Sequence, residues 1–144
     1  MDKHILSSLK FLDYKFKSVG LELNEGYKET EDSTEKPLSI TTELEIKLNH
    51  NVQKAMITIQ LGVFDKKGDE YPYKINVCMI GFFEYEQGLS EEDAIQFCKL
   101  NGTAIMFPYL RSAITDLTKI SNVEPLILPA INIHNLIQSQ GNTK

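Results

Sequence analysis

The amino-acid sequence predicts a single α+β domain, residues 1–144, in which an antiparallel sheet comes before the helices. Over most of the first half, apolar residues recur at every second position, which is the period of a half-buried strand. After Ser90 they recur at helical spacing instead. The length of 144 residues, with 42% hydrophobic and 24% charged residues, is ordinary for one folded domain. Strands followed by helices indicate helices packed on one face of the sheet.

Four segments of the first half have the pattern of strands. In the clearest of them an apolar residue or threonine alternates with a polar residue, which places the two sets on opposite sheet faces. The first strand has a polar break around Lys17 and Ser18, and the polar segment that follows is predicted to be an exposed loop, about 24–37. The four predicted strands are 9–23, 38–48, 55–63 and 73–85.

The far end of the last strand is apolar on both faces. Ile80 and Phe82 fall on the face that Lys74 and Asn76 share. Strands of this kind are usually covered on both sides. We therefore expect this face to be covered by helices of the chain or by another subunit.

The second half begins with a predicted helix at Ser90. The Ser90 hydroxyl is a typical N-cap, and the acidic residues 91–93 suit the positive end of the helix dipole, which explains them without a catalytic role. This helix is expected to run to about Lys99, where Asn101-Gly102 interrupts it.

A longer helix is predicted over 103–120. Met106, Leu110 and Ile114 belong to its apolar stripe. Because proline kinks a helix interior but is tolerated in a first turn, Pro108 predicts that the ordered helix begins close to Phe107.

The segment 124–131 is unusually apolar for a connection. It contains five apolar residues besides two prolines, and prolines favour an extended backbone. Its side chains either pack the linker onto the core or form an exposed interaction surface. Asn132 is predicted to cap a short terminal helix, and 138–144 to be a frayed tail.

The sequence lacks the motifs of common enzyme classes, with no P-loop, GxGxxG, GxSxG or HExxH. The scattered His4, His50 and His134 are interpreted as surface or structural residues rather than metal ligands. Cys78 and Cys98 form no CxxC pair and are interpreted as reduced, largely buried thiols. We therefore predict a protein that is not an enzyme and uses no cofactor or metal.

Charge and hydropathy limit the partners and the location. The net charge is −5 and no Lys/Arg cluster occurs, so nucleic acid is not an expected partner. No apolar stretch approaches the roughly 20 residues of a membrane span, and residues 1–10 lack the apolar region of a signal peptide. A cytoplasmic protein without membrane insertion is the expectation.

The most specific motif is Ile-Met-Phe-Pro-Tyr-Leu-Arg at 105–111. It is followed by the apolar segment Leu-Ile-Leu-Pro-Ala-Ile-Asn-Ile at 126–133 and then by Leu136. Upstream, Val77 through Gly81-Phe82-Phe83 forms the end of the last strand. In order and spacing these features resemble the SecB family of protein-export chaperones over about 38–137.

The resemblance implies a four-stranded antiparallel sheet followed by a long helix, an extended apolar loop and a short C-terminal helix. It implies a homotetramer, a dimer of dimers, that acts as an ATP-independent holdase for unfolded polypeptides or preproteins and hands them to the SecA ATPase. Arg111 is expected to be structural, at a subunit interface or a helix end. The residues expected to line the client groove are Phe107, Tyr109, Val123, Leu126, Leu128, Ile131 and Ile133.

The sequence departs from the family at the acidic surface that docks SecA. The corresponding positions are Ser18 and Glu22 on the first strand, and Lys74, Ile75 and Asn76 on the last. Only Glu22 is acidic, and Lys74 has the opposite sign, which weakens steering of a basic partner. Two alternatives stay open: a dedicated antitoxin chaperone of a toxin–antitoxin system, and a module that binds a small apolar ligand in a closed pocket with the apolar segment 124–131 as its lid.

Overall fold

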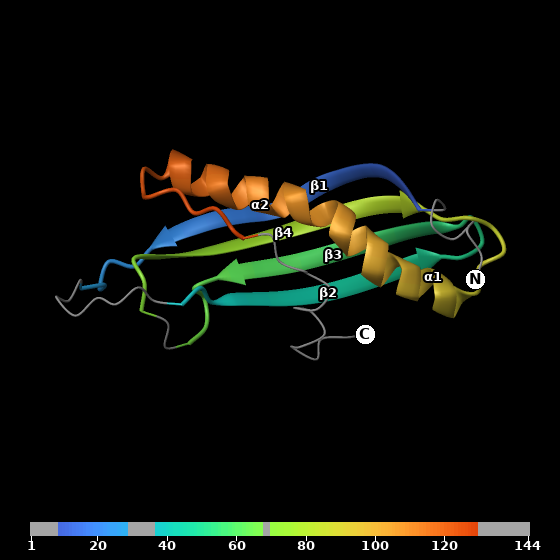
Figure 1. The fold of residues 1–144 in the computed structure, drawn as a ribbon, viewed down its shortest axis with the longest axis horizontal. Coiled ribbons are helices and arrows are strands. Elements are labelled where there is room, and N and C mark those ends of the chain that lie inside the picture. Colours follow the sequence, from blue (N-terminus) through green and yellow to red (C-terminus); the bar gives the residue numbers. More distant parts are fainter. Residues whose placement is uncertain (1–8, 29–36, 68–69, 130–144) are drawn as a thin grey trace.

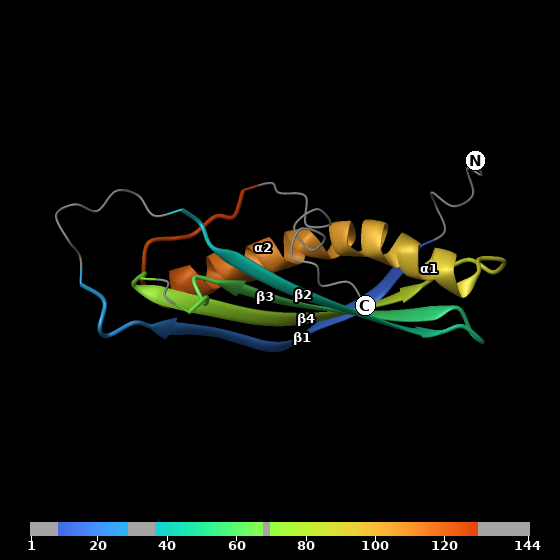
Figure 2. The same ribbon diagram turned by 90° about the horizontal axis from the view of Figure 1, so that it is seen from below.

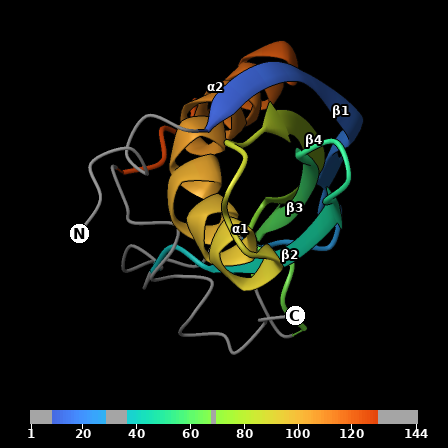
Figure 3. The ribbon, with the colours of Figure 1, turned by 90° about the vertical axis from the view of Figure 1, so that its right-hand side faces the viewer.

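The computed structural model describes residues 9–28, 37–67 and 70–129. Four strands form one antiparallel sheet in the order β1-β4-β3-β2, and the helical segments cross one face of it (Figure 1). The end-on view in Figure 3 shows the twisted sheet on one side and the helices on the other. This architecture confirms the predicted α+β class. The elements are β1 Lys10–Leu23, β2 Ile40–Asn49, β3 Lys54–Val63, β4 Tyr73–Glu84, α1 Glu91–Phe97, the π-helical η2 Cys98–Gly102 and α2 Thr103–Ile120.

The core lies between the sheet and α2. Ile59 at its centre pairs in register with Leu44 of β2 and Met79 of β4, so the apolar sets of three strands fall on the same face. Met106 and Leu110 of α2 pack into this layer and are fully buried. The period-two pattern of the sequence is thus the pattern of burial, since successive strand side chains point to opposite faces.

β1 is interrupted by two irregularities in its pairing with β4. Its register with β4 shifts between Phe11 and Asp13 and again between Phe16 and Ser18, which are two β-bulges. The second bulge coincides with the predicted polar break. Because each bulge adds one residue, Phe11 and Tyr14, three residues apart, both face the helices.

The helices differ from the prediction. The Ser90 side chain does accept a hydrogen bond from the Asp93 amide at 3.0 Å, as a cap should. However, Asn101-Gly102 does not interrupt the chain, which continues through a π-helical turn into α2. α2 already begins at Thr103, so Pro108 lies inside the helix and the expected start near Phe107 is wrong. The wider π turn joins the two α-helices without a loop, in the manner of a single-turn π-bulge inside a longer helix.

The sheet face opposite the helices is not covered by any element within the described residues (Figure 2). Ile80 and Phe82 are half-buried there. Together with Leu12 and Met56, Phe82 lines a hollow of about 400 Å³ at one end of this face. The sequence predicts that this face is covered by helices of the chain or by another subunit. The helices of the described residues lie on the other face, so they do not cover it.

Candidate functional site

The segment after α2 turns back along the helix that it leaves (Figure 1). Asn122 adopts a left-handed backbone with φ 59° and ends α2. The Val123 amide donates to the Thr118 carbonyl at 3.1 Å, and the Asn122 amide donates to the Lys119 carbonyl at 3.2 Å. This pair of bonds is a Schellman motif, which satisfies the last helical carbonyls and reverses the chain direction. The apolar segment is therefore laid against α2.

Three side chains of α2 hold the returning segment by its backbone. Arg111 Nε donates to the Leu128 carbonyl at 3.0 Å, and Thr115 Oγ1 donates to the Leu126 carbonyl at 2.8 Å. Thr118 Oγ1 accepts from the Leu126 amide at 3.1 Å and donates to the Thr115 carbonyl at 2.7 Å. Residues four and three apart lie on one helix face, so the three form a row. We call Arg111, Thr115 and Thr118 the loop clamp.

We call residues 124–129 the clamped segment, and its side chains at 126–128 alternate between core and solvent. Leu126 is half-buried, Ile127 is 68% exposed and Leu128 is fully buried in the core cluster. Val123 is half-buried and packs against the same core. The apolar segment is thus divided: Leu128 belongs to the core, whereas Ile127 is exposed. Sequence reasoning missed Ile127, although the alternation between two prolines is a usable signal.

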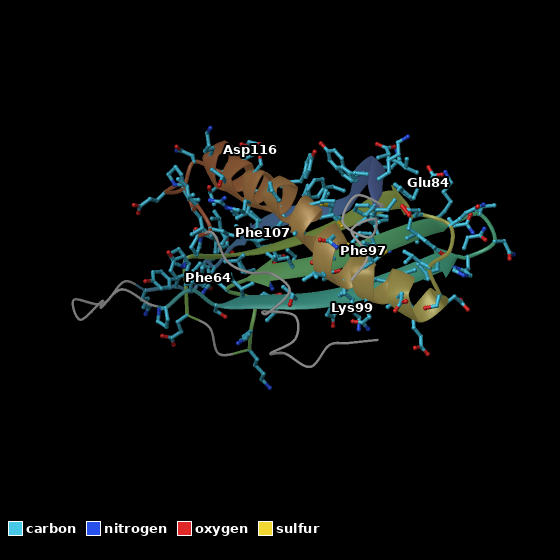
Figure 4. All side chains as sticks on the ribbon, turned by 45° about the vertical axis from the view of Figure 1, so that its right-hand side comes forward. Phe64, Glu84, Phe97, Lys99, Phe107 and Asp116 are labelled. Atoms are coloured by element: carbon cyan, nitrogen blue, oxygen red, sulfur yellow. The ribbon has the colours of Figure 1, made fainter. Side chains whose placement is uncertain are left out.

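The remaining predicted groove residues lie apart. Phe107 is on the same face of α2 as Arg111, one turn earlier, and it is buried toward the sheet, whereas Asp116 points outward (Figure 4). Tyr109 lies on the opposite side of α2, with its ring 4.6 Å from that of Tyr14 in β1. The structure therefore does not bring Tyr109 to the clamped segment. Ile131 and Ile133, and the short helix predicted at Asn132, lie outside the described residues.

A second apolar surface follows the β1 edge of the sheet. Tyr14, Val19 and Leu23 face the helix side of the sheet in register with core residues of β4, yet they are 39%, 51% and 61% exposed. Tyr14 and Tyr109 extend this surface onto α2. We call Tyr14, Val19, Leu23 and Tyr109 the β1 seam. Exposed large apolar side chains that follow one sheet edge favour an interaction surface along that edge.

The expected docking positions on the other sheet face carry paired charge. Glu22 Oε1 lies 3.2 Å from Lys74 Nζ, and the two residues are also register partners. Ser18 is exposed and Asn76 is half-buried. The one acidic residue of this region thus has its charge offset by the neighbouring lysine.

Reactive chemistry is sparse in the part of the chain that the structure describes. Cys78 and Cys98 are free, buried thiols, and burial raises the pKa of Cys98 to about 11, which keeps it protonated near neutral pH. His50 Nδ1 lies 2.6 Å from the Tyr85 hydroxyl in a structural contact. Within the described ranges there is no cluster of metal-ligating side chains, and no helix has the length and hydropathy of a membrane span. His4 and His134 lie outside these ranges.

Comparisons with known proteins agree with this fold. The family model described as preprotein translocase subunit SecB matches residues 10–144. An uncharacterised protein of Methanocaldococcus jannaschii, MJ0357, is 33% identical over 139 residues, covering 95% of this chain and 87% of the relative. The solved Rv1957 SecB-like chaperone of Mycobacterium tuberculosis, in complex with a ChAD peptide from the Rv1956 HigA1 antitoxin, superposes with a TM-score of 0.72 at 14% identity, covering 89% of this chain and 94% of that one. Since the family model spans nearly the whole sequence, the chain belongs to the SecB family.

Proposed function

We propose that this protein is an ATP-independent holdase that binds unfolded polypeptides along the clamped segment beside α2. The observation that supports this most directly is Ile127, a large apolar side chain held 68% exposed in an extended segment fixed by the loop clamp. A surface that binds many unfolded chains needs exposed apolar area and few sequence-specific polar groups. Membership of the SecB family supports the same function. The protein then acts in the cytoplasm and without catalysis.

The proposal refines the expected groove. Ile127 is the residue placed for first contact with a client, whereas Leu128 and Phe107 are buried in the core and Leu126 and Val123 are half-buried against it. Exchange of Leu128 for a charged residue would disturb the core, so loss of activity in such a variant would not report on client contact. Ile127 is exposed, so its substitution leaves the core intact and reports on client contact.

The test is suppression of aggregation of a chemically unfolded client, measured by light scattering without ATP. We expect suppression at near-stoichiometric ratios, with strong weakening in Ile127→Glu and unchanged suppression in Val52→Glu. Val52 is a matched control because it is an aliphatic residue, 51% exposed, in the distant β2–β3 turn. Failure of the wild-type protein to suppress aggregation of several clients would reject the holdase.

A dedicated antitoxin chaperone is the second candidate, favoured by the fold shared with a SecB-like chaperone in complex with an antitoxin peptide. The two candidates differ in breadth of binding. Similar affinities for several unrelated unfolded proteins would indicate a general holdase. Binding of one antitoxin, with none of the unrelated proteins bound, would indicate the dedicated chaperone.

A small-ligand module has less support. Two hollows of about 400 and 410 Å³ are lined by described residues, within the roughly 300–1,000 Å³ of typical ligand sites. Neither of these two hollows includes residues 123–129 in its lining. The apolar segment is therefore not the lid of either hollow.

For assembly, we expect a homotetramer, a dimer of dimers, in which the β1 seam is buried between two chains. SecA is not an expected partner of the Glu22–Lys74 surface, because Lys74 offsets the charge that a basic tail would need. Binding of a basic peptide from the SecA tail to the wild-type protein, measured by calorimetry, would contradict this expectation. If the lack of negative charge is all that prevents binding, the double variant Lys74→Glu and Asn76→Glu should bind the basic peptide more tightly.

A further inference from the structure

The sheet face opposite the helices has an apolar centre between two charged edge strands. Met56 of β3, with Ile80 and Phe82 of β4, points to this face and is half-buried, although no element of the described residues covers it (Figure 2). In the sheet order, β2 and β1 lie on either side of these two central strands. An apolar centre with a polar rim is the usual anatomy of a protein interface.

The two edge strands carry opposite charges at three successive levels of this face. The register of the sheet defines three rows, each of which crosses all four strands. From β2 to β1, the rows are Lys47, Met56, Phe82 and Asp13; Glu45, Thr58, Ile80 and Lys15; and Glu43, Gln60, Cys78 and Lys17. Lys17 is the extra residue of the second bulge, beside Ser18, the register partner of Cys78. We call the face that carries these three rows the outer face.

A second copy of the chain matches this charge pattern. Two outer faces stacked about a twofold axis parallel to the strands, between β3 and β4, would place β1 of each copy over β2 of the other. Lys15 would then face Glu45 of the second copy, and the facing edge charges would be opposite in the other two rows as well. A twofold axis across the strands, through the middle row, would instead place Lys15 on Lys15 and Glu45 on Glu45, and like charges oppose association.

The centre of the stack fits the same axis. Phe82 of each copy would lie over Met56 of the other, a sulfur–aromatic contact that is favourable. Stacked sheets lie about 10 Å apart with their strands within about 30° of each other, a gap that long charged side chains can bridge at the edges. Within one chain, Lys47 Nζ is 4.0 Å from Glu45 Oε2, and the two side chains are 64% and 61% exposed. This long contact leaves both charges available to a second copy.

We propose that the outer face binds the outer face of a second copy of this chain, with the strands aligned and β1 over β2. The contact goes beyond the proposed holdase and does not depend on it. It is also separate from the β1 seam, because Val19 and Leu23 of the seam point to the helix side of the sheet. Since its apolar strip is narrow and exposed ion pairs contribute little, the contact is weaker than the seam and forms only as the protein concentration rises. In dilute solution, where the seam alone is populated, charge variants of the outer face should sediment like the wild-type protein.

Sedimentation velocity over a range of protein concentrations, at low ionic strength, tests the contact. We expect the sedimentation coefficient of the wild-type protein to rise with concentration. Lys15→Glu and Glu45→Lys should each weaken this association about tenfold, because each places two like-charge contacts in a symmetric interface. The two variants change the net charge in opposite directions, so overall repulsion cannot explain a loss in both.

An equimolar mixture of the two variants is the decisive sample. A mixed pair has one native and one exchanged ion pair, so the mixture should regain association that neither variant has alone. Asp116→Lys is the matched control, because it makes the same change of net charge as Glu45→Lys at an exposed position that points outward from α2 (Figure 4). It should associate like the wild-type protein. A mixture that associates no better than either variant alone would overturn the proposal. Wild-type sedimentation that does not change with concentration would also overturn it and would leave the outer face to a different partner.

Discussion

At the scale of single residues, Gly102 shows how closely the helical layer approaches the sheet. A Cβ atom added at Gly102 would overlap Ile57 Cδ1 of β3, a fully buried side chain. The sequence suggests a helix break at this glycine, but the structure uses it for contact between layers. A glycine inside a helix is thus ambiguous until its neighbours in space are known.

We expect Gly102→Ala to lower the free energy of unfolding by about 1–2 kcal/mol. Overpacking costs about 1–3 kcal/mol, while alanine recovers up to about 1 kcal/mol of helix propensity. Urea unfolding measures the change. In an Ile57→Val background, which lacks Cδ1, the same substitution should cost less, and an equal cost in both backgrounds would rule out the contact as the cause.

The buried thiol of Cys98 predicts a loss of stability in alkali. Burial raises the pKa of Cys98 from 9.0 to about 11 in the native state. Between these values the unfolded chain has released the proton and the native chain has not, so the free energy of unfolding falls as pH rises from 9 to 11. The slope of stability against pH should be shallower in Cys98→Ala. Tyr73, whose pKa is raised to about 12 by burial and by Tyr71 and Glu124, adds a loss in the same direction above pH 10.

At the scale of elements, α2 contains a proline in its interior rather than in its first turn. Pro108 is exposed, and residues 103–107 are helical before it. Proline leaves the carbonyl four residues earlier without its helical partner and crowds it. The cost of this lost hydrogen bond is small on an exposed helix face, because water can donate to the carbonyl instead.

Pro108→Ala should therefore raise the free energy of unfolding by about 1–3 kcal/mol, since an interior proline costs about 3 kcal/mol relative to alanine. Thermal and urea unfolding both report the change. A less stable alanine variant would mean that the helix requires the proline geometry, for instance to aim the loop clamp. Client affinity of the same variant distinguishes that case.

The clamped segment shows what periodicity predicts about an element and what it leaves out. An extended, apolar segment between prolines is predicted from the sequence and is observed at 124–129. Which of its residues is exposed follows from the hydrogen bonds of Thr115 and Thr118, which lie 8 to 11 positions away in sequence from Leu126. No local pattern contains that information. Arg111, expected to be structural, is a clamp residue that bonds the Leu128 carbonyl.

At the scale of the whole molecule, the β1 seam predicts self-association. Val19 faces the helix side in register with buried Val77, yet it is 51% exposed because β1 is an edge of the described sheet. Pairing of this edge with a second chain would bury it. We expect Val19→Lys to shift the sedimentation coefficient toward a smaller species, because an inward-facing charge on an edge strand opposes pairing.

The control for this prediction is Lys15→Glu on the same strand. Lys15 is the register partner of Ile80 and lies on the other sheet face. This variant should sediment like the wild-type protein. Equal sedimentation of the wild-type and Val19→Lys proteins would count against the seam as an interface.

The type and order of the elements, and the boundaries of the strands to within a few residues, follow from the sequence, because burial against one partner layer imposes period two on a strand and a 3.6-residue period on a helix. The tertiary structure decided the rest. The bulges that turn Phe11 and Tyr14 to one face, the π turn at Gly102, the division between Ile127 and Leu128, and the separation of Tyr109 from the clamped segment all depend on contacts between residues far apart in the chain. Periodicity reports whether a residue has a buried side, whereas the partner that buries it is fixed only when the layers meet.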